Sequence, residues 1–220
     1  MNDITKLEAK ISNTLNTDLD WTRNQIAISV VWGLFLLTAS LAINYMAGTY
    51  ASAQAGNAVR DIVLDNVPVM DVDGIFTYGI IAFFVLVGLL LVQKPKRAPF
   101  VLKSLSVFVI IRSFFIVLTH IGPAQHALQI PTDSIVNYFT FTGDLFFSAH
   151  TGMPFLMALV FWKDVWLRYF FICASIMFGV IVLLGHLHYS IDVFSAFFIT
   201  YGIFQICLRL FKKEYRLLNS

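Results

Sequence analysis

The chain has 220 residues, of which 58% are hydrophobic and 13% are charged, and its formal net charge at pH 7 is +2. This composition excludes an ordinary water-soluble domain, and it is typical of a protein that lies largely in lipid. The basic residues are scattered over short links and the C-terminal end, so no nucleic-acid partner is expected. The sequence therefore predicts an integral membrane protein.

The first predicted element is the segment 1–23, which carries charges and has no apolar run long enough to cross a bilayer. It lacks the apolar core of a secretory signal peptide, so we do not expect it to be cleaved. Apolar residues recur at helical spacing, which predicts a short amphipathic helix on the membrane surface. They are Ile4, Leu7, Ile11 and Leu15. A soluble leader is an equally good interpretation of this segment.

Six apolar runs follow, and they predict an all-α, polytopic membrane protein with a bundle of six transmembrane helices, since about 20 residues cross a bilayer. The predicted spans are 24–48, 74–93, 101–122, 145–162, 166–185 and 189–210. The chain thus divides into an interfacial N-terminal segment (1–23), one six-helix domain that carries the candidate chemistry (24–210) and a basic tail (211–220).

The charges of the links predict the orientation of the bundle. Links with an excess of lysine and arginine face the cytoplasm. The basic residues are Lys94, Lys96, Arg97, Lys103, Lys163, Arg168, Arg209, Lys212, Lys213 and Arg216. The opposite links carry Asp61, Asp65, Asp71, Asp73 and Asp133. Both termini are therefore predicted to be cytoplasmic, and the acidic links, with the histidines in or beside them, to face the periplasm, the lumen or the extracellular space.

Two short motifs concentrate ionisable residues in a chain that has few of them within its spans. The first motif, residues 143–151, contains Asp144, Ser148 and His150, and the second, residues 186–192, contains His186, His188, Tyr189 and Asp192. Ionisable groups are costly in lipid, so the two motifs mark the candidate functional site. The 38 residues from His150 to His188 correspond to about two membrane crossings, which places both at the same membrane face.

The spacing of His188 and Asp192 predicts nucleophilic catalysis. Residues four apart on a helix share a face, so the carboxylate can accept from one imidazole nitrogen and leave the other free to attack. A second histidine, His150, can protonate the departing oxygen. We therefore predict three catalytic residues, His150, His188 and Asp192, and displacement at phosphorus through a phosphohistidine intermediate. A purely structural His–Asp pair is the alternative.

A zinc site is the main rival interpretation, because His150, His186, His188 and Asp192 are zinc-ligand types. The side chains of His186 and His188 would point in different directions whether the segment is a helix or a strand, so both could bind one metal ion only at an irregular turn. We predict no metal and no other cofactor.

At these two motifs the chain resembles the sphingomyelin synthase family, within the type 2 phosphatidic acid phosphatase superfamily. The superfamily signatures are Gly-Asp, three residues and Ser-Gly-His-Thr, then His-Tyr-Thr, one residue and Asp-Val. This chain matches them at Gly143, Asp144, Ser148, His150, Thr151, His188, Tyr189, Asp192 and Val193. The stretch from Arg112 through Thr119 to Pro123 also resembles the family. The chain departs from the pattern at Thr142, Ala149 and Ser190.

The resemblance implies a substrate-binding set around the catalytic residues. The sequence lacks the signature of the soluble-type phosphatases, which is Lys, six residues and Arg-Pro. Val182 stands at the position where those phosphatases have an arginine before the histidine that corresponds to His188. An unpaired guanidinium within a span is costly, so Arg112 should face the bundle interior, toward either a lipid phosphate or Asp144. Tyr189 could orient a head group or anchor the chain at the interface. The candidate substrate-binding residues are Arg112, Asp144, Ser148, His186 and Tyr189.

The function implied by the resemblance is phospholipid head-group transfer. Phosphocholine or phosphoethanolamine would move from a glycerophospholipid donor to a lipid alcohol such as ceramide, with release of diacylglycerol. Water as the acceptor would give a phospholipase C or a lipid phosphatase. A non-catalytic lipid-binding or transport protein is the alternative from another class. The expected partners are these lipids and the bilayer, and the oligomeric state is left open.

Overall fold

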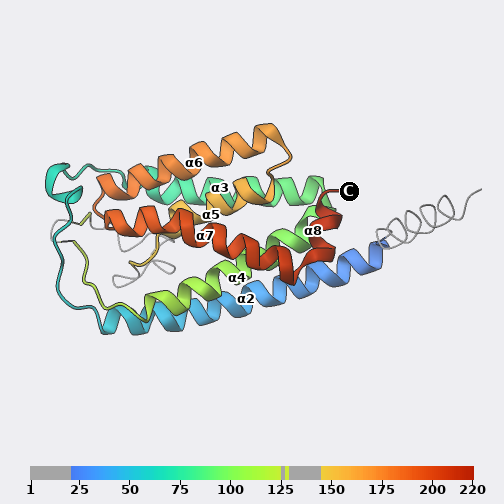
Figure 1. Cartoon of the computed structure of the whole chain (residues 1–220), viewed down its shortest axis with the longest axis horizontal. Coiled ribbons are helices and arrows are strands. Elements are labelled where there is room, and N and C mark those ends of the chain that lie inside the picture. Colours follow the sequence, from blue (N-terminus) through green and yellow to red (C-terminus); the bar gives the residue numbers. More distant parts are fainter. Residues whose placement is uncertain (1–20, 125–126, 129–144) are drawn as a thin grey trace, which may run out of the picture.

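The computed structural model describes residues 21–124, 127–128 and 145–220. Over these residues the chain is all-α, as predicted, and most of its helices run along one common direction (Figure 1). The helices are α2 (Arg23–Ala53), α3 (Asp73–Gln93), α4 (Ala98–Ile116), α5 (Ala149–Val160), α6 (Val165–Leu184), α7 (Ser190–Leu210) and α8 (Lys212–Leu218). Two short 3-10 helices, η1 (Leu64–Asn66) and η2 (Pro95–Arg97), lie in the links.

Five helices of the described chain are long and apolar enough to cross a membrane, namely α2, α3, α4 together with η2, α6 and α7. The predicted span 145–162 is the exception, because α5 has 12 residues. This corresponds to about 18 Å, which is less than the roughly 30 Å of a hydrocarbon core. The prediction of six full-length spans is therefore corrected to five long helices and one short helix.

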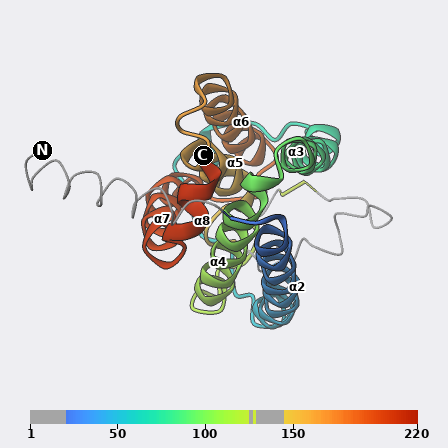
Figure 2. The same cartoon turned by 90° about the vertical axis from the view of Figure 1, so that its right-hand side faces the viewer.

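The short helix α5 lies in the middle of the bundle, with α4, α6 and α7 around it (Figure 2). Eight of its 12 residues are buried, including Leu156 and Met157, which are 0% exposed. Non-helical backbone is tolerated at membrane depth when protein surrounds it. Burial of α5 therefore explains why this segment does not need to be a full membrane-crossing helix.

The links gather at two opposite ends of the bundle (Figure 1). One end, here named the motif end, comprises residues 54–72, 117–124, 145–148 and 185–189. The other, here named the basic end, comprises residues 94–97, 161–164 and 211–220. The start of α2 also lies at the basic end, so the path of the chain agrees with the predicted alternation of the links. The orientation of these ends relative to the cytoplasm stays a prediction.

The predicted basic tail, residues 211–220, is folded onto the bundle instead of extending from it. Glu214 of α8 forms an ion pair with Lys103 of α4, whose Nζ also donates to Ser29 Oγ at 2.9 Å. Leu217 is 1% exposed. Its burial and the ion pair together fix α8 against α4. The predicted interfacial helix at the N-terminus falls on residues 1–20, which lie outside the described part of the chain.

Small residues form the contact between α2 and α4. The buried residues of α2 are Ser29, Gly33, Ser40, Ala47, Gly48 and Ala51, whereas most of its large apolar residues are exposed. Small side chains let helices in a membrane approach closely. A Cβ atom built on Gly33 would lie 2.9 Å from the Cβ of Leu102, so this position has no space for a side chain.

We expect Gly33→Ala to lower the free energy of unfolding by about 1–3 kcal/mol, because the two helix backbones must move apart. The measurement is thermal unfolding of the purified protein in detergent. Gly88→Ala is the matched control, since a Cβ atom at Gly88 of α3 would meet no described atom within 4 Å. Equal melting temperatures for the two variants would contradict the close α2–α4 contact.

Candidate active site

The two motifs meet at the motif end through their backbones. The N–H of Ser148 donates to the carbonyl of Asp192 at 3.1 Å. Ser148 also begins α5, because its Oγ accepts from the N–H of Thr151 at 3.4 Å, as an N-cap residue does. The structure therefore brings the start of α5 and the start of α7 together, although 44 residues separate Ser148 from Asp192 in the chain.

The imidazole of His188 is held by one of its two nitrogens. Its Nδ1 lies 2.8 Å from the carbonyl oxygen of Leu145 and 3.4 Å from Oδ2 of Asp192. A carbonyl oxygen can only accept, so Nδ1 carries the hydrogen and the lone pair is on Nε2. The structure thus favours the tautomer that was predicted for a nucleophile. The nearest partner of Nδ1, however, is the carbonyl of Leu145 and not the carboxylate of Asp192. A backbone carbonyl leaves no signal in the sequence.

Asp192 serves the start of α7 as well as His188. Its Oδ2 accepts from the N–H of Tyr189 at 2.9 Å, which satisfies one of the free donors at the helix N-terminus. The residue is 1% exposed, and Oδ1 has no hydrogen-bond partner among the described residues. A carboxylate is therefore buried beside His188, where it can stabilise positive charge on the ring.

His150 lies in the first turn of α5, and aromatic rings fix its orientation. Its imidazole stacks on Phe76 of α3, with ring centroids 4.1 Å apart and an angle of 21° between the planes, and its other neighbour is Phe178 of α6 at 5.9 Å. Its Nε2 is buried and has no hydrogen-bond partner within the described chain. Ser148, two residues before His150 in the chain, contacts Asp192, which lies 3.4 Å from His188. The start of α5, which carries His150, therefore lies beside the start of α7 and the His188–Asp192 pair.

Arg112 of α4 is 5% exposed and faces the bundle interior, as predicted. Its Nε donates to the carbonyl of Phe147 at 2.8 Å. The guanidinium is therefore tied to the segment just before His150. The predicted alternative partner, Asp144, lies outside the described residues, so the choice between Asp144 and a lipid phosphate stays open.

His186 and Tyr189 contact the neighbouring links. Nε2 of His186 lies 3.0 Å from the carbonyl of Val67, and the hydroxyl of Tyr189 donates to the carbonyl of Gly122 at 2.8 Å. The same hydroxyl accepts from the N–H of Val59 at 3.2 Å. These contacts give both side chains a structural role, and their predicted role in binding substrate stays a prediction.

The side chains proposed as alternative zinc ligands do not converge. Among the described residues, no group of three or more His, Cys, Asp or Glu side chains is arranged to hold a metal ion. His186 and His188 each direct a ring nitrogen at a backbone carbonyl, of Val67 and Leu145 respectively. The geometry therefore favours hydrogen-bonded histidines over joint ligation.

Asp61 supports the site from the link 54–72, and the sequence did not single it out. Its Oδ2 accepts from both the N–H and the hydroxyl of Ser190, at 2.7 and 2.8 Å, and its Oδ1 accepts from the N–H of Val63 at 2.8 Å. Burial raises the pKa of Asp61, but these hydrogen bonds outweigh it, so the pKa lies below its ordinary value of 3.8. Because Ser190 is the first residue of α7, Asp61 fixes the helix that carries Asp192.

We expect Asp61→Asn to loosen the start of α7, since hydrogen bonds to a charged group contribute about 1.5–3 kcal/mol each. A lowered pKa in the folded state means that the ionised form stabilises the fold. The contribution is complete above the ordinary pKa of 3.8 and is lost as the pH falls through the lower folded value. Amide hydrogen exchange of residues 186–193 should therefore be faster in the variant at neutral pH.

The difference from the wild type should shrink as the pH falls below about 4, where Asp61 begins to be protonated. Asp65→Asn is the matched control, because Asp65 pairs with Arg60 on the surface, where the two side chains are 40% and 94% exposed. Equal exchange in all three proteins at neutral pH would contradict the role of Asp61.

The long apolar helices and the buried His–Asp pair define a multi-pass membrane protein with a candidate catalytic site inside the bundle. Residues 142–208 match a family model described as PAP2 superfamily C-terminal, a region found in sphingomyelin synthase-like proteins. The match includes His150, His188 and Asp192. It begins at residue 142, so it does not include the stretch from Arg112 to Pro123. The matched region, which is less than half of the chain, is similar to the C-terminal part of PAP2-superfamily proteins and suggests a membrane enzyme that handles lipid phosphate.

No curated protein and no solved structure matches the chain.

Proposed function

We propose that the protein is a phospholipid head-group phosphotransferase. It would move phosphocholine or phosphoethanolamine from a glycerophospholipid to a lipid alcohol such as ceramide. The observation that carries the proposal is the hydrogen bond from Nδ1 of His188 to the Leu145 carbonyl, at 2.8 Å. This bond leaves the lone pair of Nε2 available for attack on phosphorus.

In the first half-reaction, Nε2 of His188 attacks the phosphorus atom of the donor and forms a P–N bond. The P–O bond to diacylglycerol breaks, and protonated His150 gives its proton to the departing oxygen. The phosphorylated imidazole carries a positive charge, which the buried carboxylate of Asp192 stabilises from 3.4 Å. Arg112, which is hydrogen-bonded to the carbonyl of Phe147 just before His150, would meet negative charge on the phosphoryl oxygens.

In the second half-reaction, the hydroxyl oxygen of the acceptor lipid attacks the same phosphorus atom. His150 takes the hydroxyl proton, the P–N bond breaks, and its electron pair returns to Nε2 of His188. The head group then resides on the acceptor, and both histidines are back in their starting protonation states. No cofactor takes part in these steps.

Burial of the polar groups supports transfer to a lipid over transfer to water. Ser148, His188 and Asp192 are 0%, 7% and 1% exposed. Exclusion of water suppresses hydrolysis of a reactive intermediate. We place the motif end on the non-cytoplasmic side, because the links at the opposite end carry the excess of lysine and arginine. The site would then open to the periplasmic leaflet in a bacterium, or to a lumenal or extracellular leaflet in a eukaryote.

The experiment is incubation of the purified protein with head-group-labelled phosphatidylcholine or phosphatidylethanolamine, with and without ceramide, followed by identification of the products. We expect label in a new lipid that depends on ceramide, together with release of diacylglycerol. Label only in water-soluble phosphocholine or phosphoethanolamine would show hydrolysis and contradict transfer. Unchanged donor under every condition would favour a non-catalytic lipid-binding protein.

A further inference from the structure

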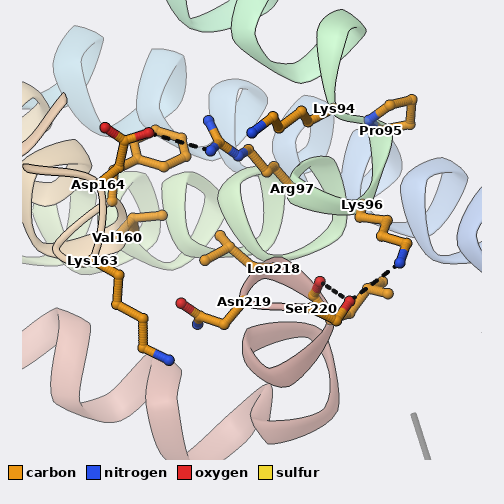
Figure 3. Close-up of a pocket in the computed structure, with 12 residues that line it drawn as sticks. Lys94, Pro95, Lys96, Arg97, Val160, Lys163, Asp164, Leu218, Asn219 and Ser220 are labelled. Carbon is orange, nitrogen blue, oxygen red and sulfur yellow. Dashed lines mark hydrogen bonds and ion pairs between the residues drawn. The ribbon is translucent and has the colours of Figure 1, made fainter. Parts of the chain in front are cut away.

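A second candidate site lies at the basic end, opposite the catalytic histidines. A cavity of about 720 Å³ opens there between η2, the α5–α6 link and the C-terminal residues. Figure 3 shows that its charged side chains come from different elements, with Lys94 and Lys96 on one side and Lys163 on another. The chain therefore brings cations together from segments far apart in the sequence.

The cavity has an excess of positive charge. The charged side chains that line it are those of Lys94, Lys96, Arg97, Lys163 and Asp164, which are four cations and one carboxylate. Asp164 pairs with Arg97 at 3.5 Å, and the Arg97 guanidinium also lies 5.1 Å from the centre of the Phe161 ring. Within the described chain, Lys94 and Lys163 form no ion pair. These two lysines are available to an anionic group.

The inner wall of the cavity is apolar. Val160, Phe161 and Leu217 line it and are buried. Beside it, Trp162 and Trp166 are 48% and 87% exposed, and tryptophan is enriched where the bilayer meets water. The cavity is therefore at the depth of lipid head groups, with cations at its rim and an apolar surface beneath them.

We propose that this cavity binds the phosphate of an anionic phospholipid, with Lys94 and Lys163 as the main phosphate contacts and the apolar wall against the glycerol and the first acyl carbons. Basic pockets between helices at the membrane surface bind anionic head groups in this way. This site is distinct from the one that performs the transfer, so the bound lipid would stabilise the protein without being its substrate.

The test uses the full chain in neutral detergent, titrated with dioctanoyl phosphatidylglycerol, with thermal stabilisation as the readout. Lys94→Gln combined with Lys163→Gln should weaken binding by about 25-fold, at about fivefold for each lysine near an anionic lipid. Lys212→Gln combined with Lys213→Gln is the matched control, because these lysines are exposed at the same end and do not line the cavity. Without lipid, all three proteins should melt at the same temperature.

Two arms identify the source of the phosphate. Dioctanoyl phosphatidylcholine should give no stabilisation that depends on Lys94 and Lys163, because its head group has no net charge. Glycerol 3-phosphate should need a concentration at least about tenfold higher than the anionic lipid. Equal weakening in both double variants, no weakening in either, or equal potency of glycerol 3-phosphate would overturn the proposal.

Discussion

His188→Ala is expected to abolish transfer and hydrolysis together, with a loss on the order of 10⁴-fold or more, as for removal of a catalytic nucleophile. Both products arise from one phosphohistidine, so removal of Nε2 stops both. The measurement is the initial rate of product formation with labelled phosphatidylcholine or phosphatidylethanolamine and ceramide, in the same detergent for every protein.

His120→Ala is the control for replacing a histidine at the motif end. His120 is exposed, and its ring packs edge-on against Tyr50. Its variant should retain the wild-type rate within about twofold. A His188→Ala protein that keeps activity within tenfold of the wild type would remove His188 from the role of nucleophile.

His150→Ala should slow the release of diacylglycerol by about 10²–10⁴-fold, because the departing alkoxide then receives no proton from the enzyme. The predicted effect depends on the leaving group. With a nitrophenyl ester of phosphocholine, the departing nitrophenolate is a weak base and needs little protonation. The measurement compares the rate of the variant with that of the wild type for both substrates.

The loss in His150→Ala should be smaller by a factor of ten or more with the nitrophenyl ester than with the lipid. His188→Ala is the matched comparison, because a missing nucleophile slows both substrates alike. An equal loss for the two substrates in the His150 variant would contradict its role as the general acid.

Much of the fold follows from the apolar runs, because a helix must satisfy its own backbone hydrogen bonds in lipid. The predicted spans 74–93, 166–185 and 189–210 lie within one residue of α3, α6 and α7 at both ends. The span 145–162 was wrong in length, because hydropathy alone does not distinguish a helix exposed to lipid from one surrounded by other helices. The sequence also did not predict that α8 folds onto the bundle, because the ion pair that holds it joins Glu214 to Lys103, which is far away in the chain.

The cost of placing ionisable groups in a membrane pointed to the two motifs as the candidate site. The sequence also predicted that the motifs of His150 and His188 lie close together, and the contact of Ser148 with Asp192 agrees with that prediction. Their catalytic roles stay a prediction. The spacing of four residues also pointed to Asp192 as a partner of His188, at 3.4 Å in the structure.

The supporting contacts could not be predicted in the same way, because they are non-local or involve the backbone. The Leu145 carbonyl has no side-chain signal, and Phe76 is one of 22 phenylalanines with no local mark. Asp61 reaches Ser190 across 129 residues. Only the three-dimensional packing of the link 54–72 on the start of α7 makes this carboxylate part of the site.

The most direct test of the central claim is to locate the covalent intermediate. The protein is mixed with head-group-labelled phosphatidylcholine or phosphatidylethanolamine without acceptor, quenched at neutral or alkaline pH and digested, and the modified peptide is identified by mass spectrometry. We predict a phosphocholine or phosphoethanolamine adduct on His188 that disappears when ceramide is added. An adduct on His150 or His186, or turnover with no adduct on His188 under single-turnover conditions, would contradict the account.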